Sequence, residues 1–332
     1  MAAANKYRID KNRDATALRP RYSRIPKVTG LLVSHRFRSV YGDAFAAAAK
    51  ARGVELELLV LPDDPEARLA DVAAARAEVA YFSSDVFPKF GKPFFSATRR
   101  AEKLKWLHVF NAGVDHPVFA SILERGVRLT TSSGTAAGPI AQTEIAGMLY
   151  LSRNVVGQTL LVYGFGKIGA EIARLARMFG LKVIGVRRHA QAHEHADEMH
   201  TPDGLHALLT RSDWLAMACP LTAETRGVID AAALAAMPKG ARVINISRGE
   251  VIDEPALIAA LASGHLGGAY LDVFAQEPLP AGSPLWDMPN VLVTAHDAST
   301  LDAYDPRINA LFLDNLAHWQ RNEPLVNEVT QL

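Results

Sequence analysis

The chain has 332 residues, enough for two domains of ordinary size that each bury a core of their own. It carries 36 Lys and Arg residues against 35 Asp and Glu residues, and this near-neutral balance argues against a binding surface for nucleic acid or for an anionic membrane. The single cysteine, Cys219, excludes an intrachain disulfide and a zinc site made of several cysteines.

The N-terminal end lacks the pattern of a targeting segment. Residues 1 to about 24 are polar and basic, without the apolar core of a signal peptide. No apolar stretch of the chain approaches the roughly 18 residues that span a bilayer. We therefore expect a cytoplasmic protein that begins with a tail of no assigned function.

Short apolar runs alternate with helical segments from Lys27 onward. Helical spacing of apolar residues is seen over Asp43–Arg52 and Pro65–Glu78. Alternation of this kind predicts a parallel sheet covered by helices. The runs that predict its strands are Leu31–Ser34, Glu55–Leu61, Val79–Phe82, Trp106–Phe110 and Val127–Thr131.

A second and clearer alternating series begins near Gly157. Most of its runs are separated by helix-length segments, which predicts a doubly wound nucleotide-binding sheet. After it, residues 305–320 place apolar side chains at helical spacing, interrupted only by Asn315. We expect this last helix to cross back onto the first sheet. The runs that predict strands of the second sheet are Thr159–Tyr163, Lys182–Val186, Trp214–Ala218, Arg242–Ile246, Ala269–Val273 and Val291–Thr294.

Residues 164–169 read GFGKIG and follow the first strand of the second series with the pattern GxGxxG. Gly164 permits a tight turn, Gly166 lets the backbone approach a pyrophosphate, and Gly169 lets the next helix pack closely on the strand. The alternative is a structural turn without a ligand. The strand before the motif and the helix after it favour a dinucleotide site, with the free amides of the helix facing the phosphates.

The end of the next predicted strand indicates which dinucleotide binds. Enzymes that use NAD usually present Asp or Glu there, for the ribose 2′-hydroxyl. This chain instead has Arg187 and Arg188, followed by His189, with no carboxylate. Because guanidinium groups match the geometry of a phosphate, the pair favours NADP(H) over NAD(H), the alternative being a solvated basic turn.

Three polar side chains follow later strands of the second series. Arg248, Glu277 and His296 are far apart in sequence, but the carboxyl ends of parallel strands meet at one edge of a sheet. Each alone has an ordinary structural interpretation, as a surface cation, a turn residue and a packed histidine. Together with the glycine turn, they predict a catalytic site.

These motifs resemble the D-isomer-specific 2-hydroxyacid dehydrogenase family, most closely its NADP-dependent glyoxylate/hydroxypyruvate reductase branch. The resemblance runs from Thr159 to about His296 and continues more weakly through Asn111–His116. It implies an α/β fold of two doubly wound parallel-sheet domains, with a Rossmann cofactor domain inserted into a flavodoxin-like catalytic domain. The implied boundaries are a tail over residues 1–24, a discontinuous catalytic domain over residues 25–151 and 299–332, and an NADP-binding domain over residues 152–298.

By this resemblance, His296 is the acid/base and Glu277 its partner. An imidazole beside a carboxylate can hold a proton near neutral pH and give it to a carbonyl oxygen that becomes an alkoxide. Arg248 binds the substrate carboxylate and polarises the carbonyl, and the amides around Ala112 and Gly113 receive the same carboxylate from the other domain. Hydride transfer from NADPH then reduces a small 2-oxoacid to the D-2-hydroxyacid.

The resemblance also implies a cofactor site. Asp272 contacts the nicotinamide carboxamide, and Cys219 and Pro220 pack near the riboside. For Cys219 we favour a packed small apolar residue over a redox role. No metal is expected. The complete expected cofactor set is Gly164, Gly166, Lys167, Ile168, Gly169, Arg187, Arg188, Cys219, Pro220, Thr225, Ile246, Asp272, His296 and Ala298.

The chain departs from the family pattern at two places. Ala295 precedes His296 where the family has proline. Only Ser152–Gln158 separates the helix ending near Leu151 from the next strand, where the family carries an arm that takes part in its dimer interface. A homodimer is therefore left open.

Several alternatives stay open from the sequence. One is a dehydrogenase of the same family that prefers NAD, and another is a nucleotide-sensing, corepressor-like binding protein of the same fold. A third is a folded relative with little activity because of the shortened arm. The 2-oxoacid is also open, since the loops over Asn111–Asp115, Thr135–Pro139 and Ser299–Tyr304 would sense its side chain.

Overall fold

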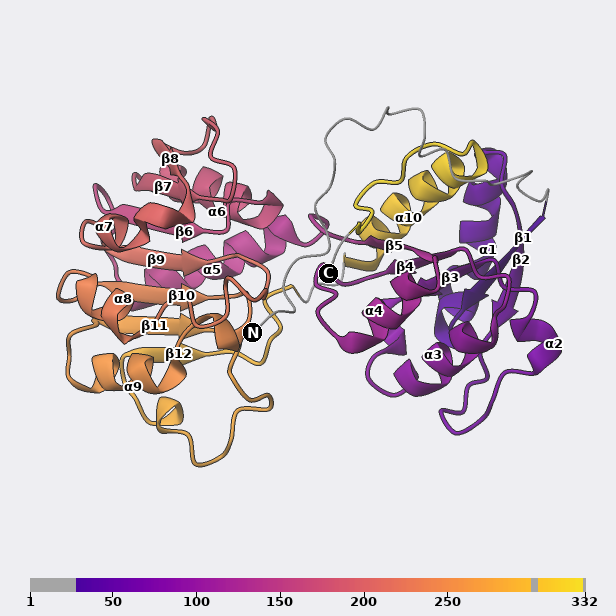
Figure 1. Cartoon of the computed structure of the whole chain (residues 1–332), viewed down its shortest axis with the longest axis horizontal. Helices are drawn as coiled ribbons and strands as arrows, with labels where there is room; N and C mark the ends of the chain where they lie inside the picture. Colours follow the sequence, from indigo (N-terminus) through magenta and orange to yellow (C-terminus); the bar gives the residue numbers. More distant parts are fainter. Residues whose placement is uncertain (1–27, 300–303, 331–332) are drawn as a thin grey trace, which may run out of the picture.

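The computed structural model describes residues 28–299 and 304–330 (Figure 1). The tail predicted over residues 1–24 and most of the loop predicted over Ser299–Tyr304 lie outside the described residues. Figure 1 shows two lobes, each built around its own sheet. No helix of the described residues is long and apolar enough to cross a bilayer, and the cytoplasmic location stays a prediction.

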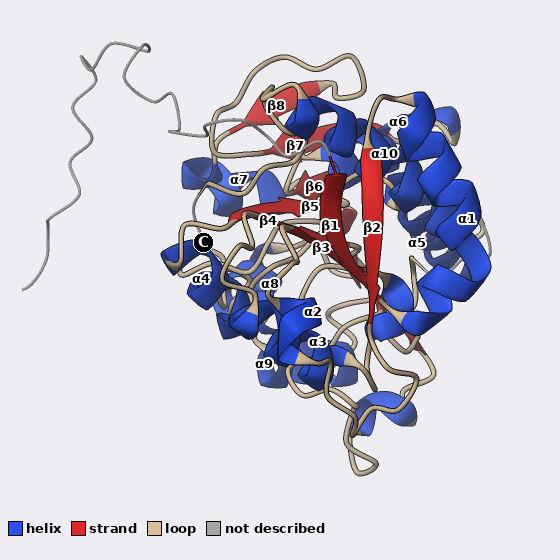
Figure 2. Ribbon diagram, turned by 90° about the vertical axis from the view of Figure 1, so that its right-hand side faces the viewer, coloured by secondary structure: helices blue, strands red, loops and turns tan. Residues whose placement is uncertain are grey.

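The first sheet has five parallel strands in the order β2-β1-β3-β4-β5. Helices cover both of its faces, as Figure 2 shows. The predicted strands are confirmed to within a few residues. The strands are β1 Val28–Val33, β2 Glu55–Val60, β3 Val79–Phe82, β4 Trp106–Val109 and β5 Arg128–Thr131; the helices between them are α1 His35–Ala51, α2 Asp71–Ala74, α3 Gly91–Arg100 and α4 Pro117–Glu124.

Two predicted helices of this lobe were wrong in extent. Helix α1 begins at His35, eight residues before the predicted Asp43, because the Ser34 hydroxyl caps it by accepting a 2.9 Å bond from the Phe37 amide. The helix predicted over Pro65–Glu78 is reduced to α2. The carbonyl of Leu69, which a longer helix would use internally, accepts a 2.9 Å bond from Arg100 instead.

The second sheet has seven parallel strands in the order β12-β11-β10-β9-β6-β7-β8. The strand order reverses between β6 and β9, the point at which doubly wound sheets bind their ligands. All six predicted strands are present, and β8 is an additional short edge strand. The strands are β6 Thr159–Tyr163, β7 Lys182–Val186, β8 Glu198–His200, β9 Trp214–Met217, β10 Arg242–Asn245, β11 Gly268–Leu271 and β12 Val291–Val293; the helices are α5 Ala137–Leu151, α6 Lys167–Met178, α7 Leu205–Leu209, α8 Ala231–Ala236 and α9 Glu254–Ala262.

The last helix, α10 (Tyr304–Gln320), packs on the first sheet although it follows the second in sequence. The ring of Phe312 is fully buried and stacks on Tyr81 of β3, with 4.4 Å between centroids. Asn315, the polar residue on the apolar face, is buried and bonds both the amide and the carbonyl of Val326. Figure 1 shows this helix, in yellow, against the indigo lobe.

Helix α5 packs on α6 and on β11 of the second sheet, through residues such as Ala141 and Ile145. The predicted boundary after Leu151 placed this helix with the first domain. The chain then reaches β6 through the seven residues Ser152–Gln158 alone. The domain boundaries given above stay a prediction, which the packing of α10 supports at the C-terminal side.

Candidate active site

The glycine turn joins β6 to α6 at the point where the strand order reverses. Gly164 has a φ of +104°, and a Cβ there would lie 2.4 Å from the amide nitrogen of Cys219. A Cβ at Gly169 would lie 2.3 Å from the carbonyl oxygen of Gly164, so the helix can pack this closely only with glycine. At Gly166 a Cβ would meet nothing within 4 Å, so this backbone faces open space at the start of α6.

Lys167, the first residue of α6, reaches from the glycine turn to the other lobe. Its ammonium donates to Asn327 Oδ1 at 2.8 Å and to the carbonyl of Ser133 at 3.4 Å. Asn327 lies after α10, and its side-chain amide also donates to Thr131 and Ser133. Lys167, which lies within the glycine motif, therefore also contacts the first lobe.

Arg187 and Arg188 are exposed directly after β7, as predicted. The Arg187 amide donates to the carbonyl of His200 at 3.0 Å, which continues the pairing of β7 with β8. Across the reversal point, the pKa of Glu224 in the loop after β9 is lowered, first by a hydrogen bond from Thr222 and in part by the charge of Arg188. The charge of Arg188 thus acts on Glu224, on the opposite side of the predicted nucleotide crevice.

His296 and Glu277 form a direct pair after β12 and β11. Nδ1 of His296 lies 2.8 Å from Oε2 of Glu277, and Oε1 of Glu277 accepts a 3.1 Å bond from the Phe274 amide. The carboxylate is therefore held on both of its oxygens. Because Nδ1 faces Glu277, the other ring nitrogen, Nε2, is left to exchange a proton with a ligand. Both side chains are partly exposed.

The backbone of His296 adopts a left-handed conformation with a φ of +55°, uncommon for a residue other than glycine. The buried carboxylate of Asp272 holds the segment around it, accepting bonds from the amides of Asp297 at 3.1 Å and Ala298 at 3.2 Å. The Thr294 hydroxyl also donates to Asp272. Burial raises the pKa of Asp272 although these donors oppose the shift. In this structure Asp272 acts on the loop that carries His296.

Arg248 follows β10 and reaches the first lobe. Its Nε and Nη2 donate to the two carboxylate oxygens of Asp115, at 3.2 and 3.0 Å, and its Nη1 donates to the Ser247 carbonyl at 2.7 Å. A Cβ at Gly113 would lie 2.1 Å from Nη2, so the guanidinium lies directly against this backbone. Burial alone would raise the pKa of Asp115, but the hydrogen bonds and charge of Arg248 lower it below its ordinary value.

The remaining predicted cofactor residues line the same edge of the second sheet. Cys219 is buried after β9, and burial raises the pKa of its thiol to about 12, consistent with a packed apolar residue. Thr225 closes the loop that begins at Pro220 by donating to its carbonyl at 2.7 Å. Ile246 and Ala298 are buried, whereas Ala112 on the first lobe is exposed.

The structure thus gathers the predicted residues at strand ends, but it joins them in two separate groups. His296, Glu277 and Asp272 form one group, and Arg248 with Gly113 forms the other. Within the described residues no hydrogen bond connects Arg248 to His296. The roles predicted for these residues stay predictions.

Two acidic residues near this site are not predicted by the sequence motifs. Asp115 is predicted only as the end of the loop Asn111–Asp115 that would sense the substrate, whereas in the structure it is the ion-pair partner of Arg248. Glu144 of α5 is fully buried, neither of its oxygens has a hydrogen-bond partner among the described residues, and burial raises its pKa to about 8. The only signal for Glu144 was one acidic residue within an apolar helix.

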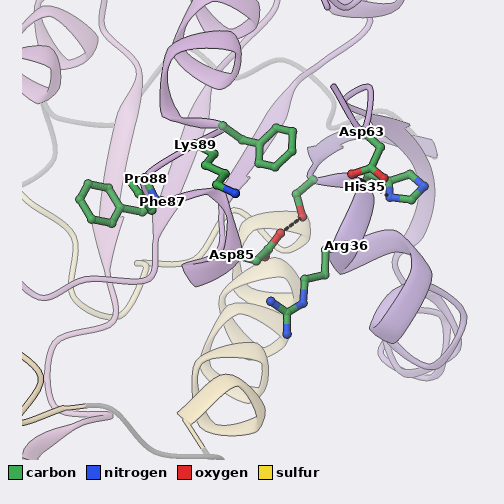
Figure 3. Close-up of a pocket in the computed structure, with 9 residues that line it drawn as sticks. His35, Arg36, Asp63, Asp85, Phe87, Pro88 and Lys89 are labelled. Atoms are coloured by element: carbon green, nitrogen blue, oxygen red, sulfur yellow. Dashed lines mark hydrogen bonds and ion pairs between the residues drawn. The ribbon is translucent and has the colours of Figure 1, made fainter. Parts of the chain in front are cut away.

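A cavity of about 300 Å³ lies in the first lobe, at the carboxyl ends of β1, β2 and β3 (Figure 3). Asp85 lies at its wall and accepts bonds from the hydroxyls of Ser34 and Ser83. His35 and Asp63 form a second pair there, 3.6 Å apart. No residue of the predicted site lines this cavity.

Comparisons with known proteins agree with this geometry. A family model described as D-isomer specific 2-hydroxyacid dehydrogenase, NAD binding domain, matches residues 136–298. Glyoxylate/hydroxypyruvate reductase B of Pectobacterium atrosepticum is 34% identical over 246 residues, which cover 66% of this chain and 76% of that protein. The chain belongs to the D-isomer specific 2-hydroxyacid dehydrogenase family. The family resemblance and the fold class expected from the sequence are therefore confirmed.

Other members of the family are similar over different lengths. Glyoxylate reductase of Korarchaeum cryptofilum is 38% identical over 187 residues, and the match spans only 55% of that protein and of this chain. Among solved structures, a D-isomer specific 2-hydroxyacid dehydrogenase from Xanthobacter autotrophicus in complex with NADPH and MES has a TM-score of 0.73 at 30% identity. That likeness covers 91% of this chain and 97% of the other.

Proposed function

We propose that the chain is a reductase that uses NADPH to convert a small 2-oxoacid, of the size of glyoxylate or hydroxypyruvate, into the D-2-hydroxyacid. The observation that carries this proposal is the His296–Glu277 pair, 2.8 Å apart at the carboxyl edge of a doubly wound sheet. A proton donor at this edge, beside a dinucleotide turn, suits the reduction of a carbonyl group.

The residues present fit a dinucleotide. The backbone at Gly166 faces open space at the start of the twelve-residue helix α6, whose free amides suit a pyrophosphate. We assign the cofactor to this turn and to the loops after β7, β9 and β11. When bound, the nicotinamide supplies the hydride that is added to the 2-oxo carbon.

The protein's own residues then bind the acid and manage its proton. Arg248 would pair with the carboxylate and polarise the carbonyl, together with the backbone amides of Ala112 and Gly113. His296 would hold a proton at Nε2 and donate it to the carbonyl oxygen as that oxygen gains negative charge. Glu277 would orient the imidazole and stabilise its charged form through Nδ1.

The preference for NADPH over NADH rests on the end of β7. Arg187 and Arg188 are both exposed, and the next two residues are His189 and Ala190, so no carboxylate is available there for a ribose hydroxyl. The similar Xanthobacter autotrophicus protein was solved with NADPH. The two arginines and this similarity support a preference for NADPH. A dehydrogenase that prefers NAD is the alternative.

We also propose that the cofactor domain, predicted over residues 152–298, is inserted into the substrate domain, predicted over residues 25–151 and 299–332, with α5 at their boundary packed against the cofactor domain. The test of the whole proposal is absorbance decay of NADPH, and separately of NADH, with glyoxylate, hydroxypyruvate and larger 2-oxoacids. We expect turnover with NADPH and the smallest acids. Tight NADPH binding with no turnover on any acid would instead favour a nucleotide-sensing binding protein.

A further inference from the structure

We propose that Asp115 is a positioning residue, which fixes the guanidinium of Arg248 over the Ala112–Gly113 backbone and so sets the affinity for the carboxylate of the 2-oxoacid. This inference rests on the proposed function, because it assigns the carboxylate to Arg248. It adds a residue from the first lobe to a site whose other charged side chains follow strands of the second sheet.

The contact between Asp115 and Arg248 is bidentate, and it uses one edge of the guanidinium. Nε and Nη2 donate to different oxygens of Asp115, while Nη1 donates to the Ser247 carbonyl. An arginine side chain has five N–H groups. Three are used by these contacts, which leaves two for another acceptor. The ion pair with Asp115 therefore does not exhaust the capacity of Arg248 to bind a substrate carboxylate.

The position of Asp115 also explains where the guanidinium lies. Asp115 follows Gly113 by two residues, and Nη2 of Arg248 lies only 2.1 Å from the position that a Cβ of residue 113 would occupy. Arg248 is thereby held against the backbone that we assign to the same carboxylate. An arginine side chain has many rotamers, so a partner that fixes one of them reduces the entropy lost when the substrate binds.

If Asp115 instead competed with the substrate for Arg248, its removal would change KM in the opposite direction. A competitor would lower the affinity for the 2-oxoacid, and its removal would lower KM. A positioning residue raises the affinity, and its removal raises KM. The charge of Arg248 keeps the pKa of Asp115 low, so Asp115 is ionised at neutral pH under either role.

The decisive variant is Asp115→Asn. Asparagine offers one acceptor and one donor in place of two acceptors, so only one of the two bonds from Arg248 can persist. We expect KM for the 2-oxoacid to rise about tenfold, the size of a lost charged bidentate contact, with kcat changed much less and KM for NADPH unchanged. Asp115→Glu, which keeps the charge, should recover part of the affinity.

Asp314→Asn is a matched control. Asp314 of α10 also accepts from the Nε and Nη2 of one arginine, Arg52, at 3.3 Å, but it lies outside the site. This variant should leave both KM values unchanged. Thermal unfolding and NADPH binding of each variant separate a folding defect from a loss of positioning.

Binding of oxalate, measured by calorimetry, tests the inference without turnover. For Asp115→Asn, we expect the dissociation constant of oxalate to be about tenfold larger, in a folded protein that still binds NADPH. If Asp115→Asn left the dissociation constant of oxalate or the KM for the 2-oxoacid unchanged, or lowered either of them, the positioning role of Asp115 would be wrong. If the wild-type chain reduces no 2-oxoacid, the proposed function fails, and the oxalate result still decides whether Asp115 positions Arg248.

Discussion

The imidazole of His296 is held from one side by Glu277, with 2.8 Å between Nδ1 and Oε2, while the second oxygen of Glu277 accepts the Phe274 amide. The carboxylate cannot rotate freely, because both oxygens have partners. The pair therefore defines which nitrogen of His296 is available to a ligand.

Removing the imidazole tests the predicted acid. His296→Ala should lose about 10²- to 10⁴-fold in kcat with glyoxylate, because the proposed proton donor is removed, while NADPH binding is retained. Steady-state kinetics and fluorescence titration with NADPH measure the two quantities. His35→Ala is the control, since His35 also lies beside a carboxylate, that of Asp63, but in the other lobe. Unchanged kcat in His296→Ala would remove the proposed acid.

The basic pair after β7 predicts cofactor selectivity. Replacing Arg187 and Arg188 together by alanine should raise KM for NADPH about tenfold or more, because the two guanidinium groups proposed to bind the 2′-phosphate are lost, and should leave KM for NADH nearly unchanged. Kinetics with each cofactor at saturating 2-oxoacid measure the ratio. Arg99→Ala, on the exposed side of α3, is the control. Equal effects on both cofactors would contradict the preference for NADP.

The buried carboxyl of Glu144 predicts how stability depends on pH. Its pKa is raised by burial from 4.5 to about 8, so the folded protein holds a proton that the unfolded chain releases between these values. The contribution of Glu144 to the free energy of unfolding should therefore decrease as pH rises from 4.5 to 8, by on the order of a few kcal/mol. Glu144→Gln should remove this dependence.

Thermal unfolding of the wild type and of Glu144→Gln at pH 5 and pH 8 provides the comparison. The midpoint of the wild type should fall more between the two pH values than that of the variant. The same change in both proteins would show that Glu144 does not carry the dependence.

The burial of Phe312 predicts how much the contact between α10 and the first sheet contributes to the free energy of unfolding. Phe312→Ala should lower the free energy of unfolding by about 3–5 kcal/mol. The fully buried ring stacks on Tyr81, and its removal leaves a cavity in the core. Phe312→Leu, which keeps most of the volume, should cost less. Urea unfolding measures both, and a small effect of the alanine variant would mean that α10 contributes little to this core.

Local sequence was sufficient for some of these features. The strands of both sheets are short apolar runs, and the glycine turn is a contiguous motif, so each could be predicted from neighbouring residues. The residues after strand ends followed from the rule that parallel strands share an edge. The start of α1 was missed because its first turns are polar, although Ser34 is a recognisable cap.

The rest depended on contacts between distant residues. Asp115 and Arg248 are 133 positions apart, and no local pattern links them. Strand β8 has only three residues, Glu198–His200, and its pairing comes from β7 rather than from apolar periodicity. The burial of Glu144 requires α6 and β11 to be placed first.

The return of α10 to the first sheet means that the chain passes between the two lobes twice, once before α5 and once before α10. A single linker would let one lobe twist and swing in any direction about the other. Two crossings suppress twisting and leave bending about the line through both as the easy motion. Any opening between the lobes should therefore be a bending motion, and it should act directly on the Arg248–Asp115 contact, which joins the two lobes.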